Sequence, residues 1–301
     1  MTAPEPTRGG FNETDMRHIL ERACAAASLD PTGAELLRGH TNAVVRLTSA
    51  PVVVKIARRG TPVAEVQRTV QFVRWLMDRG FPTVDLHPVP QQPVVVDGHP
   101  VTFWRYLPQP EQPVSAAQIA KPLYTLHNLP APPFLLRPLD TVAAIRASLA
   151  RTKALPDESI RFLSRRVDRL ENCLAEVRFE LPAASLQGDP QHRNALHDSG
   201  QVVLCDWDTV VSGQPEWDLV TIEVHCRRFG YGQDHYGTFA ETYGFDVTAW
   251  SGFPVLRDLR ELRMITTNAR KLPHAPQTFG EVQRRVEGLR AEDTKLAWFI
   301  L

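Results

Sequence analysis

Residues 186–210 read LQGDPQHRNALHDSGQVVLCDWDTV. In this stretch a Gly-Asp pair is followed by an asparagine five residues after the aspartate, and a second aspartate ends an apolar run. The Asp-Ser-Gly at 198–200 is a turn signal before an apolar run, which predicts a hairpin. Such a hairpin would return Asp206 towards the loop that carries Asp189 and Asn194. The oxygen ligands of Asn194 and Asp206 would then converge on one divalent cation, and Asp189 would remain available as a base.

Each of these side chains has an ordinary structural explanation when it is taken alone. Asp189 fits a turn or cap residue, Asn194 a loop residue and Asp206 the end of a strand. Lys55, which lies upstream in a Val-rich run, fits an outward-facing solvated lysine equally well. Together the four favour a site for phosphate and metal, because phosphoryl transfer needs Mg²⁺ ligands, a cation for the nucleotide phosphates and a carboxylate that orients the attacking hydroxyl.

The first hundred residues have the pattern of an antiparallel sheet crossed by a helix. The segment ELLRGHTNAVVRLTSAPVVVKIAR has Val- and Leu-rich runs around turn signals at 39–42 and 49–51, which predicts strands. Gly98 separates two further strand-like runs. Apolar residues recur at helical spacing in residues 13–30 and again in 61–79.

After residue 107 the character of the sequence changes. The segment PQPEQP indicates a linker, and helical periodicity then dominates. It recurs at residues 116–126, 141–151, 159–179, 216–229 and in several segments within 235–291. We therefore predict an α+β fold with a small antiparallel-sheet N-terminal lobe over 1–107, containing one crossing helix, and a larger helical C-terminal lobe over 108–301.

Charge and hydropathy exclude several classes of protein. The 301 residues carry 34 Lys and Arg against 34 Asp and Glu, so there is no net charge to attract nucleic acid or an anionic membrane. No apolar run is long enough to span a bilayer, and the N-terminus lacks the apolar core of a secretory signal. We expect a cytoplasmic protein that acts without nucleic acid or membrane, as a monomer or weak dimer.

Cysteines and histidines do not indicate a transition-metal centre. The four cysteines form no CxxC pair, so we expect reduced, buried thiols. His40, His192, His197 and His225 are not at the spacing of a motif such as HExxH, and we interpret each as structural or solvent-facing.

The motifs of residues 186–210 resemble those of the aminoglycoside phosphotransferase family, within the wider eukaryotic-protein-kinase-like fold. The family pattern is His-Gly-Asp, four residues, Asn, and then a strand ending in Ile-Asp-Trp-Glu or similar. Here it stands as QGDPQHRN at 187–194 and as CDWD at 205–208. A later Pro and Asp-Leu of the family stand as PEWDL at 215–219. With weaker matches upstream, the resemblance extends over roughly residues 30–270.

The resemblance implies a bilobal protein-kinase-like fold and a small-molecule kinase. Such an enzyme transfers the γ-phosphoryl group of ATP, or of GTP, to a substrate hydroxyl with Mg²⁺. Lobe 1–107 would bind the nucleotide, and lobe 108–301 would carry the catalytic loop and the acceptor site. Asp189 would orient and deprotonate the hydroxyl, while Asn194 and Asp206 would bind Mg²⁺.

The resemblance also implies supporting roles around these three residues. Lys55 would contact the α- and β-phosphates and pair with a glutamate on the following helix. Glu65 is the candidate for that glutamate, although it also fits an ordinary charge on a helix surface. Asp218 would support the catalytic loop by hydrogen bonds rather than touch the substrate.

Two further segments resemble the parts of the family's nucleotide site that contact adenine and the phosphates. The backbone of Arg105, Tyr106 and Leu107, within TFWRYLP, would hydrogen-bond adenine. The turn from Gly39 to Asn42 would lie against the phosphates, and with one glycine it would cradle them more weakly than a glycine-rich loop does.

The catalytic loop departs from the family at two places. Gln187 replaces a histidine that braces the loop backbone, and we expect little loss because glutamine can both donate and accept hydrogen bonds. Gln191-His192-Arg193 replaces the common His-Pro-Gly, and Arg193 there either touches phosphate or caps the loop.

The acceptor remains open at this level. Acidic residues after Asp206 suit a cationic aminoglycoside, but arginines follow closely, so the signal is mixed. Asp208 and Glu216 either face the acceptor pocket or lie on the surface. A role in antibiotic resistance follows from the family name alone. The alternatives are a metabolite kinase that acts on a sugar or an amino-alcohol, and a nucleotide-binding pseudokinase without turnover.

Overall fold

The computed structural model describes residues 13–39 and 42–301. The chain divides into two compact units, one formed by residues 1–112 and 196–208 and the other by 113–195 and 209–301. The predicted α+β fold class is confirmed. The functional division into lobes 1–107 and 108–301 stays a prediction.

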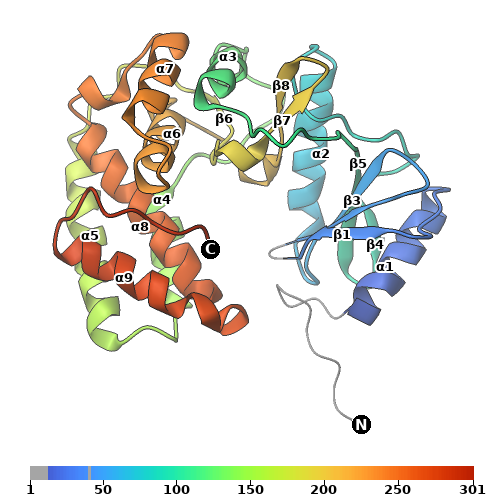
Figure 1. The fold of residues 1–301 in the computed structure, drawn as a ribbon, viewed down its shortest axis with the longest axis horizontal. Helices are drawn as coiled ribbons and strands as arrows, with labels where there is room; N and C mark the ends of the chain where they lie inside the picture. Colours follow the sequence, from blue (N-terminus) through green and yellow to red (C-terminus); the bar gives the residue numbers. More distant parts are fainter. Residues whose placement is uncertain (1–12, 40–41) are drawn as a thin grey trace. The chain divides into compact units, whose positions relative to one another are not determined.

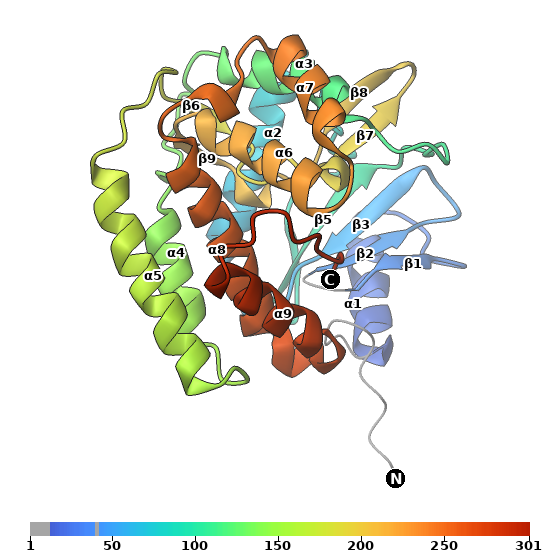
Figure 2. The same ribbon diagram turned by 60° about the vertical axis from the view of Figure 1, so that its left-hand side comes forward.

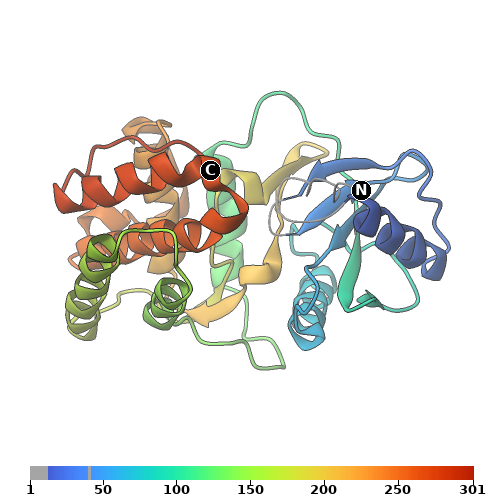
Figure 3. The same ribbon diagram turned by 90° about the horizontal axis from the view of Figure 1, so that it is seen from below.

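An antiparallel sheet with two helices forms most of the first unit (Figure 1). The strands follow the order β1-β2-β3-β5-β4. Their bounds are Glu35–Arg38 for β1, Ala43–Arg46 for β2, Val52–Ile56 for β3, Val94–Val96 for β4 and His99–Arg105 for β5. The helices are α1, Glu13–Ala26, and α2, Val63–Met77. Figure 3 shows the same unit from below, with α1 close to the sheet.

Strand alternation decides where Lys55 points. On β3, Val52, Val54 and Ile56 are buried and belong to a core shared with the apolar face of α1. Because successive side chains of a strand point to opposite faces, Lys55 lies on the face away from that core. In the sheet it stands opposite Val44 of β2.

The hairpin predicted around residues 198–200 is present. It consists of β7, Ala195–Asp198, and β8, Gln201–Leu204. Ser199 and Gly200 both have positive φ, 50° and 88°, as a two-residue type I′ turn requires. The hairpin end is fastened within the first unit, where the Leu204 amide donates to Pro82 O at 3.0 Å and Trp207 Nε1 donates to Thr83 Oγ1 at 2.9 Å.

Helices dominate the second unit. They are α3, Ala116–His127; α4, Thr141–Ala150; α5, Asp157–Ala175; α6, Glu216–Arg228; α7, Gln233–Tyr243; α8, Phe253–Lys271; and α9, Phe279–Arg290. Two short strands, β6 at Ala184–Leu186 and β9 at Val211–Gly213, pair antiparallel just before and after residues 187–210. The helix predicted over 159–179 begins two residues earlier and ends at Ala175.

The long helix α8 organises this unit by packing against α4, α5, α6 and α9, which Figure 2 shows gathered around it. Helix α6 is enclosed, with twelve of its thirteen residues buried. Among the described residues, no helix is both long and apolar enough to cross a membrane. The cytoplasmic location stays a prediction.

Candidate active site

Lys55 is held between two carboxylates in the first unit. Its Nζ lies 2.7 Å from Asp206 Oδ1 and 2.8 Å from Asp208 Oδ2, and its side chain is 16% exposed. Asn42 joins the cluster by donating from Nδ2 to Asp208 Oδ2 at 3.0 Å. Lys55 is therefore not the freely solvated lysine that its strand alone allowed. Asp208 faces this cluster rather than an acceptor pocket.

The charges in this cluster stabilise one another. Burial disfavours the ammonium of Lys55, but the negative charges of Asp206 and Asp208 outweigh burial and raise its pKa. The positive charge of Lys55 lowers the pKa of Asp206 against the effect of burial, helped by their hydrogen bond and by Arg38. At neutral pH the cluster thus presents an ionised carboxylate and a cation, the forms that bind a metal and a phosphate.

Glu65 lies in the first turn of α2. The ion pairs that the structure describes for Lys55 go to Asp206 and Asp208. The pairing of Lys55 with Glu65 stays a prediction.

The backbone predicted to bind adenine is already partly hydrogen-bonded. The Arg105 amide donates to Asp85 O at 2.9 Å, and the Tyr106 amide donates to Pro51 O at 2.8 Å. Leu107 O accepts from Gln109 Nε2 at 3.0 Å. Adenine recognition by residues 105–107 stays a prediction, and the bonds of the first two amides make Leu107 the best placed donor.

The predicted phosphate turn is only partly described. Gly39 and Asn42 flank residues 40 and 41, which lie outside the described residues, as does the expected structural role of His40. A phosphate contact by Gly39 stays a prediction, whereas Asn42 is brought to the Lys55 cluster by its bond to Asp208.

The Asp189 loop of the second unit is held by a buried carboxylate. Asp218 accepts from the amides of Gln187 at 2.8 Å and Gly188 at 2.9 Å. Gln187 Oε1 accepts from the Asp189 amide at 2.7 Å, so the glutamine braces the loop as expected of it. Asn194 Nδ2 donates to Asp189 O at 2.8 Å and closes the loop from its far end. The loop-supporting role predicted for Asp218 is observed.

The carboxylate of Asp189 is oriented by two side chains. Oδ1 forms a close ion pair with Arg260 Nη2, and Oδ2 accepts from Gln191 Nε2 at 3.0 Å. The Asp189 side chain is 26% exposed, so it remains reachable. It borders a cavity of about 490 Å³ that lies within the second unit.

Sequence reasoning gave Arg260 no role, because α8 lies 71 residues further along the chain and no local motif marks it. Asn194 belongs to the second unit and Asp206 to the first. Their convergence on one Mg²⁺ stays a prediction.

A histidine pair fixes the middle of the loop. The ring of His192 stacks on Tyr231 with centroids 4.1 Å apart, and its Nε2 lies 3.0 Å from His235 Nε2. The Ala116 amide donates to that same His235 nitrogen at 3.0 Å, so His192 is the donor in the pair. Burial and the neighbouring His235 lower the pKa of His192 to about 4, which keeps its ring neutral.

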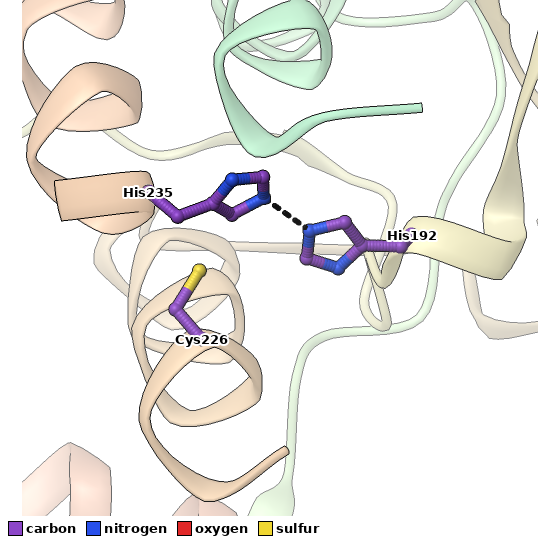
Figure 4. A group of neighbouring side chains, drawn as sticks. All are labelled: His192, Cys226 and His235. Atoms are coloured by element: carbon purple, nitrogen blue, oxygen red, sulfur yellow. Dashed lines mark hydrogen bonds between the residues drawn. The ribbon is translucent and has the colours of Figure 1, made fainter. Parts of the chain in front are cut away.

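Cys226 completes a group that spacing did not reveal. Figure 4 shows its thiol beside the two rings, and the ligand atoms of His192, Cys226 and His235 lie within 4.8 Å of one another. Burial raises the pKa of the thiol to about 12, so it is protonated. We interpret the group as a structural brace, since the two histidines are already joined to each other and to the Ala116 backbone.

Acidic residues of α6 are engaged in structural contacts. Glu216 is fully buried and accepts from the amides of Glu180 at 2.7 Å and Leu181 at 2.9 Å. Glu223 pairs with Arg227 at 2.7 Å. Glu216 therefore neither faces an acceptor pocket nor lies on the surface, because its carboxylate anchors the chain before β6.

Because His225 on α6 is buried, we predict that the free energy of unfolding of the protein decreases at acid pH. Its residue is 8% exposed, and burial, followed by the positive charge of Arg260, lowers its pKa well below the usual value. The unfolded chain takes up a proton on this imidazole below about pH 6.5, whereas the folded protein does not until lower pH. The free energy of unfolding should therefore fall with decreasing pH, by at most about 1.4 kcal/mol per pH unit for this group.

The variant His225→Phe should show a weaker fall in melting temperature between pH 7.5 and pH 5.5 than the wild type does. The exposed His274 supplies the control, because His274→Gln should follow the wild-type profile. Equal acid sensitivity in His225→Phe and wild type would show that His225 is not the titrating group.

Comparison with known proteins agrees with this geometry. A model of the phosphotransferase enzyme family matches residues 32–259. Among curated proteins no match is found.

Several solved structures share the fold at low identity. A microcompartment-associated aminopropanol kinase has a TM-score of 0.72 at 15% identity, with 93% of this chain and 99% of that chain covered. An amicoumacin kinase in complex with AMP-PNP, Ca²⁺ and Ami has a TM-score of 0.70 at 12% identity, with 95% and 96% covered. The choline kinase LicA from Streptococcus pneumoniae has a TM-score of 0.67 at 18% identity, with 92% and 99% covered.

These neighbours have the protein-kinase-like fold that the resemblance implied. The family match spans the Lys55 cluster, the Asp189 loop and the first part of α8. The chain is thus a member of the phosphotransferase enzyme family, with the fold of the small-molecule kinases that act on a hydroxyl group.

Proposed function

We propose that this kinase transfers the γ-phosphoryl group of ATP, or of GTP, to a hydroxyl group with Asp189 as the base. The observation that carries the proposal is the oriented and reachable carboxylate of Asp189 at the border of a 490 Å³ cavity. The hydroxyl oxygen forms a bond to the γ-phosphorus as the bond to the β–γ bridging oxygen breaks. The nucleoside diphosphate leaves with that electron pair, and the hydroxyl proton passes to Asp189.

Lys55, Asp206 and Asn194 would supply the rest of the chemistry. Lys55 would contact the nucleotide phosphates, and its present partners Asp206 and Asp208 show that the site holds it charged. The ionised Asp206 and the amide oxygen of Asn194 are hard ligands of the kind that fit Mg²⁺. When bound, Mg²⁺ would neutralise charge on the phosphates. Several neighbours contain nucleotides, with AMP-PNP and Ca²⁺ together in the amicoumacin kinase.

The supporting nucleotide contacts are proposed from the same fold. Glu65 would help to position Lys55, and Leu107 would donate its amide to adenine. Gly39 and Asn42 would lie near the phosphates. The bond from Asn42 to Asp208 supports its place there.

Turnover is favoured over a binding-only role because the base, the cation and both metal ligands are all retained. The test is an ADP-release assay over aminoglycosides, macrolides, sugars, hydroxy acids and amino-alcohols. ADP release that depends on one hydroxyl compound supports the kinase. Thermal stabilisation by nucleotide without ADP release over this whole panel would instead favour the pseudokinase. A resistance role requires that the accepted compound be an antibiotic.

Asp206→Ala should remove the Mg²⁺-dependent part of nucleotide affinity. We expect ATP binding in the presence of Mg²⁺ to weaken by roughly tenfold or more, equivalent to about 1.4 kcal/mol, and binding in EDTA to change little. Isothermal titration calorimetry with and without Mg²⁺ measures both. Asp97→Ala, which removes an exposed carboxylate from the same unit, is the control. An unchanged Mg²⁺ dependence in Asp206→Ala would remove Asp206 from the metal site.

A further inference from the structure

The cavity beside Asp189 is strongly basic. Six cationic side chains line it, and they are Arg193, Arg260, Arg263, Arg270, Lys271 and Arg285. Asp189 supplies the one side-chain carboxylate among its described lining residues. A polycationic acceptor such as an aminoglycoside would meet like charge on most of this surface.

Some of these cations are neutralised by the protein itself. Arg260 pairs with Asp189, and Arg285 pairs with Glu281 at 2.8 Å and donates to the Phe299 carbonyl. The charge of each of these two arginines is therefore paired with a carboxylate of the protein.

Arg263 and Arg270, in contrast, are not paired with a carboxylate of the described residues. Within residues 13–39 and 42–301, neither has a carboxylate within 4.0 Å. The described polar contact of Arg263 is a long one, 3.5 Å from its Nη1 to Thr141 Oγ1. Both side chains lie on α8 and both border the cavity.

The crowding of positive charges in the cavity is unfavourable for Arg263, Arg270 and Arg260. Burial, with the like charge of Arg260, lowers the pKa of Arg263 to about 10. Burial and the like charge of Arg151 lower the pKa of Arg270. The residue Arg260 is only 5% exposed, and its buried Nε has no hydrogen-bond partner among the described residues. Guanidinium groups remain charged at neutral pH, so the cavity holds cations that an anion would stabilise.

We propose that the cavity binds an anionic group of the acceptor, so that the substrate is a hydroxyl compound that carries a carboxylate or a phosphate. Arg263 and Arg270 ligate that group, and the hydroxyl reaches Asp189 at the border of the same cavity. This inference rests on the proposed kinase function. It sets this chain apart from family members that act on cationic aminoglycosides.

Nucleotide phosphate has the same anionic chemistry as the acceptor group. The acceptor is favoured because the whole lining belongs to the second unit, whereas the proposed phosphate cation Lys55 belongs to the first. Experiments with the nucleotide site occupied separate the two sources.

The first experiment measures binding of inorganic phosphate in the presence of saturating ADP and Mg²⁺. Thermal melting and calorimetry are carried out at constant ionic strength, with chloride as the reference anion. We expect saturable binding that weakens at least tenfold in Arg263→Gln and in Arg270→Gln. Arg257→Gln, on the same helix but outside the cavity, should match the wild type. Failure to bind phosphate under these conditions, or equal binding in both cavity variants and wild type, overturns the proposal.

The melting temperature of the Arg263 variant distinguishes a ligand-binding role of Arg263 from a role in stabilising the fold. Without added anion, Arg263→Gln should melt at or above the wild-type temperature, because it removes a half-buried charge that has no carboxylate partner among the described residues. Arg228 is the contrast, since its guanidinium is buried and bonded to Glu261 at 2.6 Å. Arg228→Gln should therefore lower the melting temperature. A comparable loss of stability in Arg263→Gln would show that Arg263 serves the fold instead of the ligand.

The second experiment measures ADP release with acceptors of similar size that differ in charge. The first set is glucose 6-phosphate and gluconate, which are anionic, glucose, which is neutral, and glucosamine, which is cationic. Wider sets of anionic, neutral and cationic hydroxyl compounds follow. Preference for anionic acceptors, with KM raised at least tenfold in Arg263→Gln and kcat little changed, supports the inference. Preference for neutral or ammonium acceptors overturns it and leaves the kinase standing. Phosphate binding without ADP release from any acceptor leaves the anion site standing and counts against the kinase.

Discussion

Asp189→Asn should lower kcat by about 10³-fold, equivalent to about 4 kcal/mol in the activation free energy. Asparagine keeps the size of the side chain and an oxygen that accepts from Arg260, but it cannot take up the hydroxyl proton. Because the substitution leaves Lys55, Asn194 and Asp206 in place, nucleotide affinity should stay within about twofold. The measurement is steady-state ADP release with the best acceptor of the panel, together with nucleotide titration.

The control for this change is Asp168→Asn, which alters an exposed aspartate on α5. It should retain wild-type kcat and KM. Activity of Asp189→Asn within about tenfold of wild type would show that another group accepts the proton. A joint loss of nucleotide affinity would instead show that the loop itself has been displaced.

Gly188→Ala should destabilise the protein by roughly 3 kcal/mol or more. Gly188 has a φ of +84°, and a Cβ there would lie 2.3 Å from the Thr209 carbonyl oxygen. A left-handed backbone costs a non-glycine residue about 1 kcal/mol, and the clash adds to it. A shift of Gly188 that relieves the clash would weaken the charged hydrogen bond from its amide to Asp218, which contributes roughly 1.5–3 kcal/mol.

Gly244→Ala is the matched control for this glycine. Gly244 belongs to the same unit and has a φ of +88°, but nothing lies within 4 Å of its added Cβ. It should therefore lose only the conformational part of the free energy. Thermal melting with and without nucleotide measures the difference. Equal melting temperatures for the two variants would contradict the close packing of Gly188 against Thr209.

Short-range signals in the sequence predicted the hairpin and the loop. The turn at 198–200 forms because serine and glycine there adopt the positive φ values that a tight hairpin needs. The sequence alone left Lys55 equally compatible with a solvated lysine, and the structure shows it on the strand face opposite to the buried Val52, Val54 and Ile56. Gln187 braces the Asp189 amide because its side-chain oxygen can accept a hydrogen bond from that amide. In each case, neighbours within a few residues decide the outcome.

Other contacts of the site join residues that are far apart in the chain, and periodicity and motif spacing in the sequence do not predict such contacts. Arg260 reaches Asp189 from α8, and His235 reaches His192 from α7. The acidic residues after Asp206 read as possible pocket charges, yet Glu216 is enclosed because α6 runs through the middle of its unit. The cations of the cavity come from the Asp189 loop, from α8 and from α9, so the sequence of any one of these segments does not predict a basic cavity.

Helix α6 has a consequence for how members of this family acquire new substrates. Its first turn holds the Asp189 loop through Asp218 and the segment before β6 through Glu216, and nearly all of the helix is buried. Substitutions there would disturb the machinery of transfer. The cations Arg263 and Arg270 stand on another helix, α8, and among the described residues neither forms an ion pair with Asp218 or Glu216. Selection can therefore exchange the charge of the accepted molecule at Arg263 and Arg270 while Asp218, Glu216 and Arg260 keep the Asp189 loop unchanged.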